Sequence, residues 1–262
     1  MIKAEVMTRY QDWTRRYVLR GLAMGSELWA DVSTHPAVAR LEAIAQAHGR
    51  SIDADDIADR ITRPLLLAVI HAAGGIEYTI EKLVAALDVV QQRADEHSPP
   101  APEFPKLGDL WGPERWDVSF EVSNLVIWAR TLVERLESKD KVRGIQVGLL
   151  PALAEGDLKD HVRRFHDELA HWVEAESYLA GYTLHIGPLH GGTPWLRRRP
   201  DGRVKFLLPD RPGRKVWSVE EFTYRCDRDA RTVADDLLRR VERFMDGLLT
   251  GFEQHIPERF RR

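Results

Sequence analysis

The chain has 262 residues with a formal net charge of -3, 44% hydrophobic residues and one cysteine. This length fits one large domain or two small ones, and the single cysteine excludes an internal disulfide and a cysteine-based zinc site. No apolar run approaches the roughly 18 residues of a membrane span, and the N-terminus lacks the apolar stretch of a signal peptide. We therefore expect a cytoplasmic protein without membrane association.

Residues 1–96 are expected to form an N-terminal helical segment of four or five helices. The Gly74-Gly75 pair predicts a break before a helix over Ile76–Gln92, because glycine is unfavourable inside helices. Apolar residues recur in that last helix at helical spacing, namely at Ile80, Leu83, Leu87 and Val90.

Residues 97–115 contain five prolines, which are Pro99, Pro100, Pro102, Pro105 and Pro113. Each proline removes a backbone donor and restricts the residue before it, so this stretch is predicted to be a Pro-rich linker or wrapped loop. It is also the expected domain boundary. Residues 116–262 are then expected to form a helical bundle with one inserted β-hairpin, which makes the fold class mainly α.

Three helices are predicted in the first half of this bundle. A helix over Val118–Ser138 carries a stripe of apolar residues spaced alternately by four and three, which is typical of a buried bundle face. The stripe consists of Val118, Val122, Leu125, Ala129, Leu132 and Leu136. A short helix near Val147–Ala154 and a long helix over Asp157–Tyr182 follow.

A β-hairpin at residues 195–208 is predicted next. Its two strands flank Pro200-Asp201-Gly202, in which proline fixes φ and glycine accepts a positive φ. The final helix is expected to begin with a capping box formed by Ser218 and Glu221. Cys226 would then lie on the buried side of this helix as a small core residue.

The helix over Asp157–Tyr182 gathers the side chains able to do acid–base chemistry, which are Arg164, His166, Asp167, Glu168 and His171. Its two histidines are five residues apart, about 140° around a helix, so they do not form the i, i+4 pair of a zinc protease. The Glu168-x-x-His171 pattern matches half of a di-iron motif, but a second copy is missing. Gly-rich phosphate or dinucleotide motifs are absent as well. We expect neither a metal nor a cofactor.

Arg164 and His171 form the strongest candidate pair. Seven residues apart, they fall within about 20° of each other around a helix and roughly 10 Å apart along it. A histidine can move a proton near neutral pH, and an arginine can hold a phosphate and stabilise its developing charge. The pair would suffice for metal-free RNA cleavage by the substrate's own 2′-hydroxyl. The alternative is a solvated helix face with ordinary i, i+3 and i, i+4 charge pairs.

The Arg-x6-His pattern on a long helix of a small bundle resembles the HEPN superfamily, common among prokaryotic toxins and defence ribonucleases. The resemblance covers at most Trp116–Glu253. It implies that Arg164 binds phosphate, that His171 is the catalytic histidine, and that two copies form a homodimer. A toxin would also have an antitoxin-type partner. The chain resembles actinobacterial proteins too, and its 30 arginines against 8 lysines suit a GC-rich genome.

One position departs from the HEPN motif. The family favours Asn, Asp or His after the arginine, where this chain has Phe165. A second framing, His166-Asp167-x3-His171, restores the polar residue but puts a histidine in the place of the arginine. In either framing His166 and Asp167 would orient His171 or the substrate.

The hairpin region is strongly basic. His190–Ser218 contains eight basic and two acidic residues, so it carries +6 and the remainder of the chain -9. The candidate RNA-binding residues are Arg197, Arg199, Arg203 and Lys205, with Trp195 or Trp217 available to stack a base. Ordinary solvated hairpin charges are the alternative. The remaining functional hypotheses are a non-catalytic RNA-binding or protein-scaffold protein and a small-molecule sensor.

Overall fold

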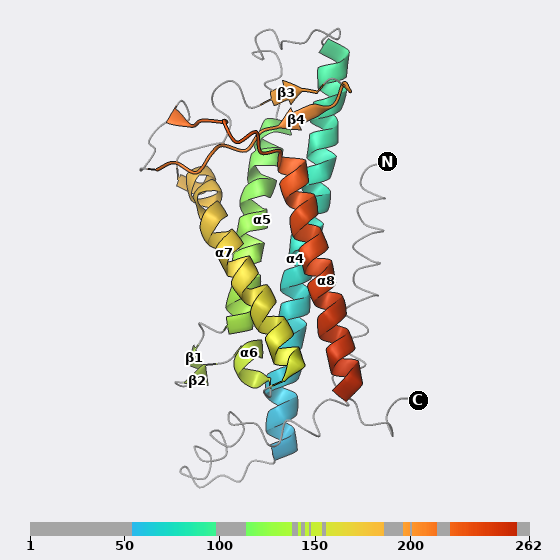
Figure 1. The fold of residues 1–262 in the computed structure, drawn as a ribbon, viewed down its shortest axis with the longest axis vertical. Helices are drawn as coiled ribbons and strands as arrows, with labels where there is room; N and C mark the ends of the chain where they lie inside the picture. The colour runs from blue at the N-terminus through green and yellow to red at the C-terminus, as the bar shows by residue number, and fades with distance from the viewer. Residues whose placement is uncertain are drawn as a thin grey trace. The chain divides into compact units, whose positions relative to one another are not determined.

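The computed structural model describes residues 54–97, 114–137, 141–142, 145–146, 148–153, 156–185, 196–199, 201–213 and 221–255. Its helices are α4 (Ala54–His97), α5 (Glu114–Glu137), α6 (Leu149–Ala152), α7 (Asp157–His185) and α8 (Ala230–His255). Its strands are β1 (Lys141–Val142), β2 (Ile145–Gln146), β3 (Leu196–Arg198) and β4 (Val204–Phe206). Helix makes up 79% of the described residues, which confirms a mainly α fold with an inserted hairpin (Figure 1).

The described residues fall into two compact units. The first contains Ile76–Trp128 and Trp172–Arg240, and the second contains residues up to Gly75, Ala129–His171 and residues from Val241 onward. Each unit therefore takes helical segments from α4, α5, α7 and α8. Since residues 98–113 lie outside the described part of the chain, the predicted domain boundary at 97–115 stays a prediction. The predicted helices of residues 1–53 also lie outside it.

The predicted apolar stripe of α5 is confirmed. All six of its residues are at most 3% exposed: Val118, Val122, Leu125, Ala129, Leu132 and Leu136. Burying such side chains contributes about 1.5–3 kcal/mol each relative to leaving them in water. The spacing of four and three residues thus identified the inward face of this helix correctly.

The predicted break at Gly74-Gly75 is wrong, because α4 continues through both glycines and through Pro64. Each glycine costs about 1 kcal/mol relative to alanine inside a helix. Ala73 and Ile76, on either side of the pair, are fully buried. Packing of this helical face outweighs the local cost, as is common for helices within a folded protein.

In the second unit, aromatic rings join α7 to α8. The rings of Phe165 and Phe244 stack with their centroids 3.9 Å apart and their planes 6° apart. The His161 ring also stacks on Phe244 with the centroids 5.8 Å apart, and its Nε2 lies 3.2 Å from the carbonyl oxygen of Phe244. A Cβ at Gly247 would lie 2.5 Å from the same Nε2. Glycine at this position therefore lets the α8 backbone approach His161.

The predicted hairpin is confirmed in the first unit. β3 and β4 pair antiparallel, with Leu196 opposite Phe206 and Arg197 opposite Lys205. The amide of Gly202 donates to the carbonyl of Arg199 at 3.0 Å, and Gly202 has a φ of 84°, which glycine adopts without strain. A second ladder, β1 with β2, was not predicted from the sequence.

The start of the last helix differs from the prediction. α8 begins at Ala230 rather than at the capping box, whose Ser218 lies outside the described residues. Asp229 is the residue before the helix, and its carboxylate accepts a hydrogen bond from the Thr232 hydroxyl at 3.2 Å. Short polar side chains at this position satisfy the free amides of a first helical turn. The helix thus starts about one dozen residues later than local sequence indicated.

Cys226 consequently lies in the turn before α8 and is exposed, so its predicted place in the core is wrong. The Asp210 carboxylate organises this turn by accepting bonds from the amides of Arg225 at 2.7 Å and Cys226 at 3.0 Å. A hydrogen bond to the same carboxylate raises the pKa of the Cys226 thiol. A raised thiol pKa lowers the thiolate fraction at neutral pH, which argues against a reactive cysteine.

Across the described ranges, no helix combines the length and apolar character needed to cross a bilayer.

Candidate functional site

α7 places three of the four candidate catalytic residues on its exposed surface, namely Arg164, Asp167 and His171. Arg164 and His171 are both exposed, and both lie in the second unit. The Arg164 Nε–H donates only a long bond of 3.4 Å to the carbonyl oxygen of Asp160, one turn back. The neighbouring Arg163, by contrast, is engaged by the Asp160 carboxylate at 2.9 Å. The Arg164 guanidinium therefore remains available to a ligand.

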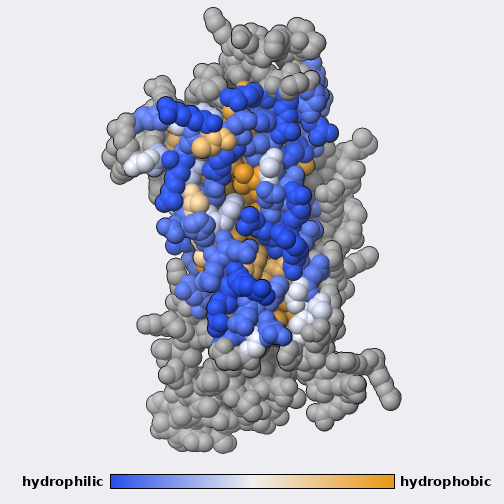
Figure 2. Space-filling view, in the orientation of Figure 1, coloured by the Kyte–Doolittle hydropathy of each residue, from blue (hydrophilic) through white to orange (hydrophobic). Residues whose placement is uncertain are grey.

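His166 points elsewhere. Its side chain is 12% exposed, its Nδ1 lies 3.0 Å from the Asp167 carboxylate, and its Nε2 lies 3.7 Å from the Glu137 carboxylate on α5. Asp167 is exposed but contacts His166 rather than His171. The structure thus brings His166 and Asp167 together, and it does not join them to the Arg164–His171 pair. Figure 2 shows that the described residues on the visible face are mostly hydrophilic.

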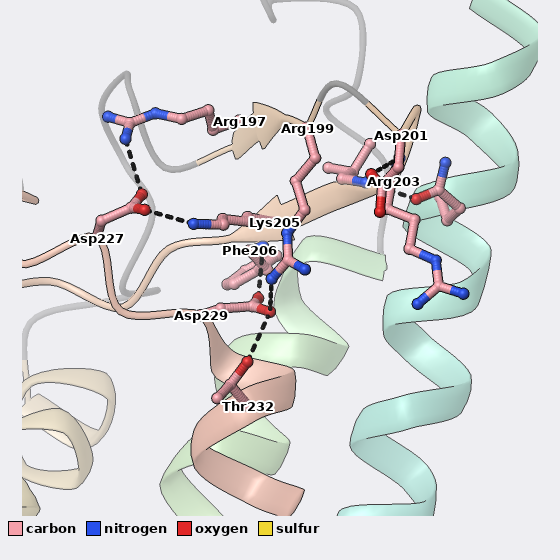
Figure 3. Close-up of polar contacts among 11 residues, drawn as sticks. Arg197, Arg199, Asp201, Arg203, Lys205, Phe206, Asp227, Asp229 and Thr232 are labelled. Atoms are coloured by element: carbon pink, nitrogen blue, oxygen red, sulfur yellow. Dashed lines mark hydrogen bonds and ion pairs between the residues drawn. The ribbon is translucent and has the colours of Figure 1, made fainter.

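The four candidate RNA-binding residues of the hairpin meet acidic partners that the sequence analysis did not anticipate. Asp227 pairs with Arg197 at 2.7 Å and also with Lys205, the residue opposite Arg197 on the partner strand. The hydrogen bond from Lys205, helped by the charge of Arg197, holds the pKa of the Asp227 carboxyl below its usual value. These two basic side chains therefore share one ionised carboxylate (Figure 3).

Asp229 fixes the hairpin to the start of α8. Its carboxylate accepts bonds from the Arg199 guanidinium at 3.3 Å and from the amide of Phe206 at 3.2 Å, in addition to the Thr232 hydroxyl (Figure 3). Among the described residues, the guanidinium of Arg203 has no hydrogen bond or ion pair. Arg203 is thus the one member of the predicted set without a partner in the described part of the first unit.

Replacing Asp229 by alanine is expected to lower the free energy of unfolding by about 2–3 kcal/mol, because its bond from Thr232 in the first turn of α8 and its bonds from the hairpin are lost together. Asp236→Ala, which removes an exposed i, i+3 partner of Arg239 on the same helix, is the matched control and should cost under about 0.5 kcal/mol. Urea denaturation of both variants measures the difference. Equal losses would contradict the role assigned to Asp229.

Gln91 fixes the hairpin to α4. Its Oε1 accepts the amide of Val204 at 2.7 Å, while its Nε2 donates to the Asp95 carboxylate at 3.0 Å and to the carbonyl of Gly202 at 3.4 Å. Between the hairpin, α4 and α8 lies a cavity of about 430 Å³. The residues lining it are Leu87, Asp88, Gln91, Arg199, Arg203, Val204, Asp229, Arg231, Thr232 and Asp235.

A polar network in the C-terminal half of α7 was also not predicted from the sequence. Arg228 donates to the Glu176 carboxylate and, at 3.0 Å, to the Tyr178 hydroxyl, which in turn donates to the carbonyl of Pro209 at 2.5 Å. Burial raises the pKa of Glu176, although the Arg228 charge opposes this. The only sequence signal is a glutamate at a position that α7 buries. These residues hold the loop after the hairpin against α7.

Within the described ranges, no group of three or more His, Cys, Asp or Glu side chains is placed to hold a metal ion. No protein-family model, curated protein or solved structure matches the chain. The chain is a mainly α protein with an inserted hairpin.

Proposed function

We propose that this chain is a HEPN-like, metal-independent endoribonuclease that acts in the cytoplasm as a homodimer, as a toxin or defence component. The observation that carries the proposal is the availability of Arg164 and His171. Both are exposed on α7, seven residues apart, and neither has a side-chain partner among the described residues. Two residues at this spacing can reach one phosphodiester.

In the proposed reaction, His171 accepts the proton of the ribose 2′-hydroxyl, and the 2′-oxygen attacks the adjacent phosphorus. The bond to the 5′-oxygen breaks, which leaves a 2′,3′-cyclic phosphate on one fragment. His171 of a second copy would donate the proton that the departing 5′-oxygen needs. Arg164 stabilises the negative charge that develops on the phosphate oxygens.

His166 is not a catalytic group in this proposal, because its ring is directed at Asp167 and Glu137 and not at the exposed pair. The hairpin gives less support to the alternative of a non-catalytic RNA-binding module. Arg197, Arg199 and Lys205 already meet carboxylates, so binding of phosphates there would compete with existing ion pairs.

The test is cleavage of single-stranded and hairpin RNAs by the purified protein in EDTA. His171→Ala is expected to lower the rate by about 10²–10⁴, because it removes general acid–base catalysis, and Arg164→Ala by about 10²–10³, because it removes charge stabilisation. Arg163→Ala is the matched control, since Arg163 is paired with Asp160, and its rate should stay within about twofold of wild type.

The ends of the products provide a second readout, because the mechanism requires 2′,3′-cyclic phosphates. Absence of cleavage from every RNA tried would overturn the proposal. Cleavage that persists unchanged in His171→Ala would do the same, because it would come from another residue or from a contaminating enzyme.

A further inference from the structure

The cavity between the hairpin, α4 and α8 is lined by charged side chains that are not all paired with one another. Three arginines and three aspartates line it. Two pairs are closed, since Arg199 binds Asp229 and Arg231 binds Asp88. Among the described residues, the guanidinium of Arg203 and the carboxylate of Asp235 have no partner. The cavity therefore offers one cation and one acceptor to a ligand.

We infer that this cavity binds a small phosphate monoester bearing hydroxyl groups, such as a sugar phosphate or a mononucleotide. Arg203 would bind the phosphate and Asp235 would accept a bond from a hydroxyl. The volume of about 430 Å³ lies in the range of small-molecule sites. This inference does not rest on the ribonuclease proposal, because none of its residues belongs to the Arg164–His171 pair.

The donor capacity of the arginines favours a phosphate. A guanidinium has five N–H donors in a planar fork that matches phosphate oxygens, whereas an ammonium acts as a point charge. Arg199 and Arg231 each use an Nη2 donor for an aspartate, which leaves further donors on both groups. Figure 3 shows Arg199 and Arg203 extending from the hairpin. Of these two arginines, only Arg199 contacts Asp229.

The walls of the cavity are held in place without a ligand. Gln91 binds the β4 backbone at Val204 and the turn at Gly202, and Asp229 binds the β4 backbone at Phe206. The hairpin is thus tied to α4 on one side and to the start of α8 on the other. A site that is formed in advance loses less conformational entropy when a ligand binds.

A nucleic-acid strand fits this region less well. Binding along a phosphate backbone needs several available cations, and each neutralised phosphate adds to the salt dependence. Arg197 and Lys205 are both held by Asp227, and Arg199 is held by Asp229, so three of the four candidate RNA-binding residues would have to break an ion pair to bind RNA. A ligand with a single phosphate matches this arrangement better than an RNA chain does.

Calorimetric titration of the whole chain with inorganic phosphate, ribose 5-phosphate and AMP tests the inference. We expect Arg203→Gln to weaken the binding of ribose 5-phosphate or AMP by about tenfold or more, the effect of losing a charge-assisted bond. Asp235→Asn should weaken the binding of these two probes but not that of inorganic phosphate. Arg239→Gln removes an equal charge from an exposed position of α8 and should change affinity less than twofold.

Comparison of the probes separates the possible sources of the ligand. Tighter binding of AMP than of ribose 5-phosphate would identify a mononucleotide, and equal binding would identify a sugar phosphate. The inference would be overturned if neither bound at millimolar concentration, or if Arg203→Gln and Arg239→Gln weakened binding equally. Arg203-dependent binding of an RNA oligomer alone, with a steep loss of affinity in salt, would overturn it in favour of a nucleic-acid surface.

Discussion

Arg228→Ala is expected to destabilise the protein by about 3–5 kcal/mol, the usual cost of leaving one charge of a buried pair without its partner. The Glu176 side chain is only 7% exposed, and Arg228 is its hydrogen-bonding partner. The second carboxylate oxygen of Glu176, Oε2, has no hydrogen bond in the described part of the chain. Arg228 also donates to the Tyr178 hydroxyl, so the substitution removes a second bond within the network.

The loss should depend on pH. Burial raises the folded-state pKa of Glu176 above its unfolded value, so its protonated form favours the folded state. That contribution is fully present below the unfolded pKa and is lost as the pH rises through the folded pKa. The Arg228 charge lowers this pKa. Without it, the folded-state pKa of Glu176 rises further, and the protonated form persists to higher pH. Arg228→Ala should therefore cost more stability at pH 8 than at pH 5.

Chemical denaturation at both pH values measures this effect, and a second substitution provides the control. Adding Glu176→Gln to Arg228→Ala removes the orphaned charge and should restore a large part of the lost stability at pH 8. A loss below about 1 kcal/mol at pH 8, where a broken buried ion pair should cost most, would contradict the prediction. So would an equal loss at the two pH values.

Phe244→Ala is expected to lower the free energy of unfolding by about 3–5 kcal/mol, which is typical of truncating a buried aromatic side chain. Phe244 is 1% exposed and stacks on Phe165 of α7. Its removal would leave a cavity beside the Phe165 ring and withdraw the surface on which His161 stacks. The effect should be independent of pH between 7 and 9, because the cost is one of packing.

Phe244→Leu separates the ring contact from simple burial. Leucine keeps most of the apolar volume, so the expected loss is about 1–1.5 kcal/mol, near the value of an aromatic pair and of a volume-conserving exchange. Urea denaturation of both variants measures these losses from the shift in midpoint, provided that the m values are unchanged. Equal losses for the alanine and leucine variants would show that stacking, and not the filling of volume, dominates this contact.

Local patterns predicted most of the described fold. The α5 stripe follows from the helical period alone, and the hairpin follows from the residues of its turn. The buried positions Val162, Phe165 and Leu169 of α7 also recur at helical spacing. In each case the deciding residues are neighbours in sequence, so short-range sterics and amphipathic periodicity determine the result.

The remainder depends on contacts between residues far apart in the chain. Gly74-Gly75 remains helical because Ala73 and Ile76 are buried, which local propensity cannot indicate. The Asp227 carboxylate accepts a hydrogen bond from Arg197, which lies 30 residues earlier in the chain. Pairing over such distances has no signature in local composition. The exposure of Arg164 and His171 fits both a catalytic pair and a solvated helix face, and the inward position of His166 was found only in the structure.

The interleaving of the two compact units affects when the protein can fold during its synthesis. Both units need α8: the first buries Leu237, and the second buries Leu248 and Leu249. Ribosomes add about 5–20 residues per second, so α4 and α5 are made several seconds before α8. During that interval their apolar faces lack the surface that later covers them. Neither core can close until α8 has emerged from the ribosome, so folding depends on what protects the apolar faces of α4 and α5 until then.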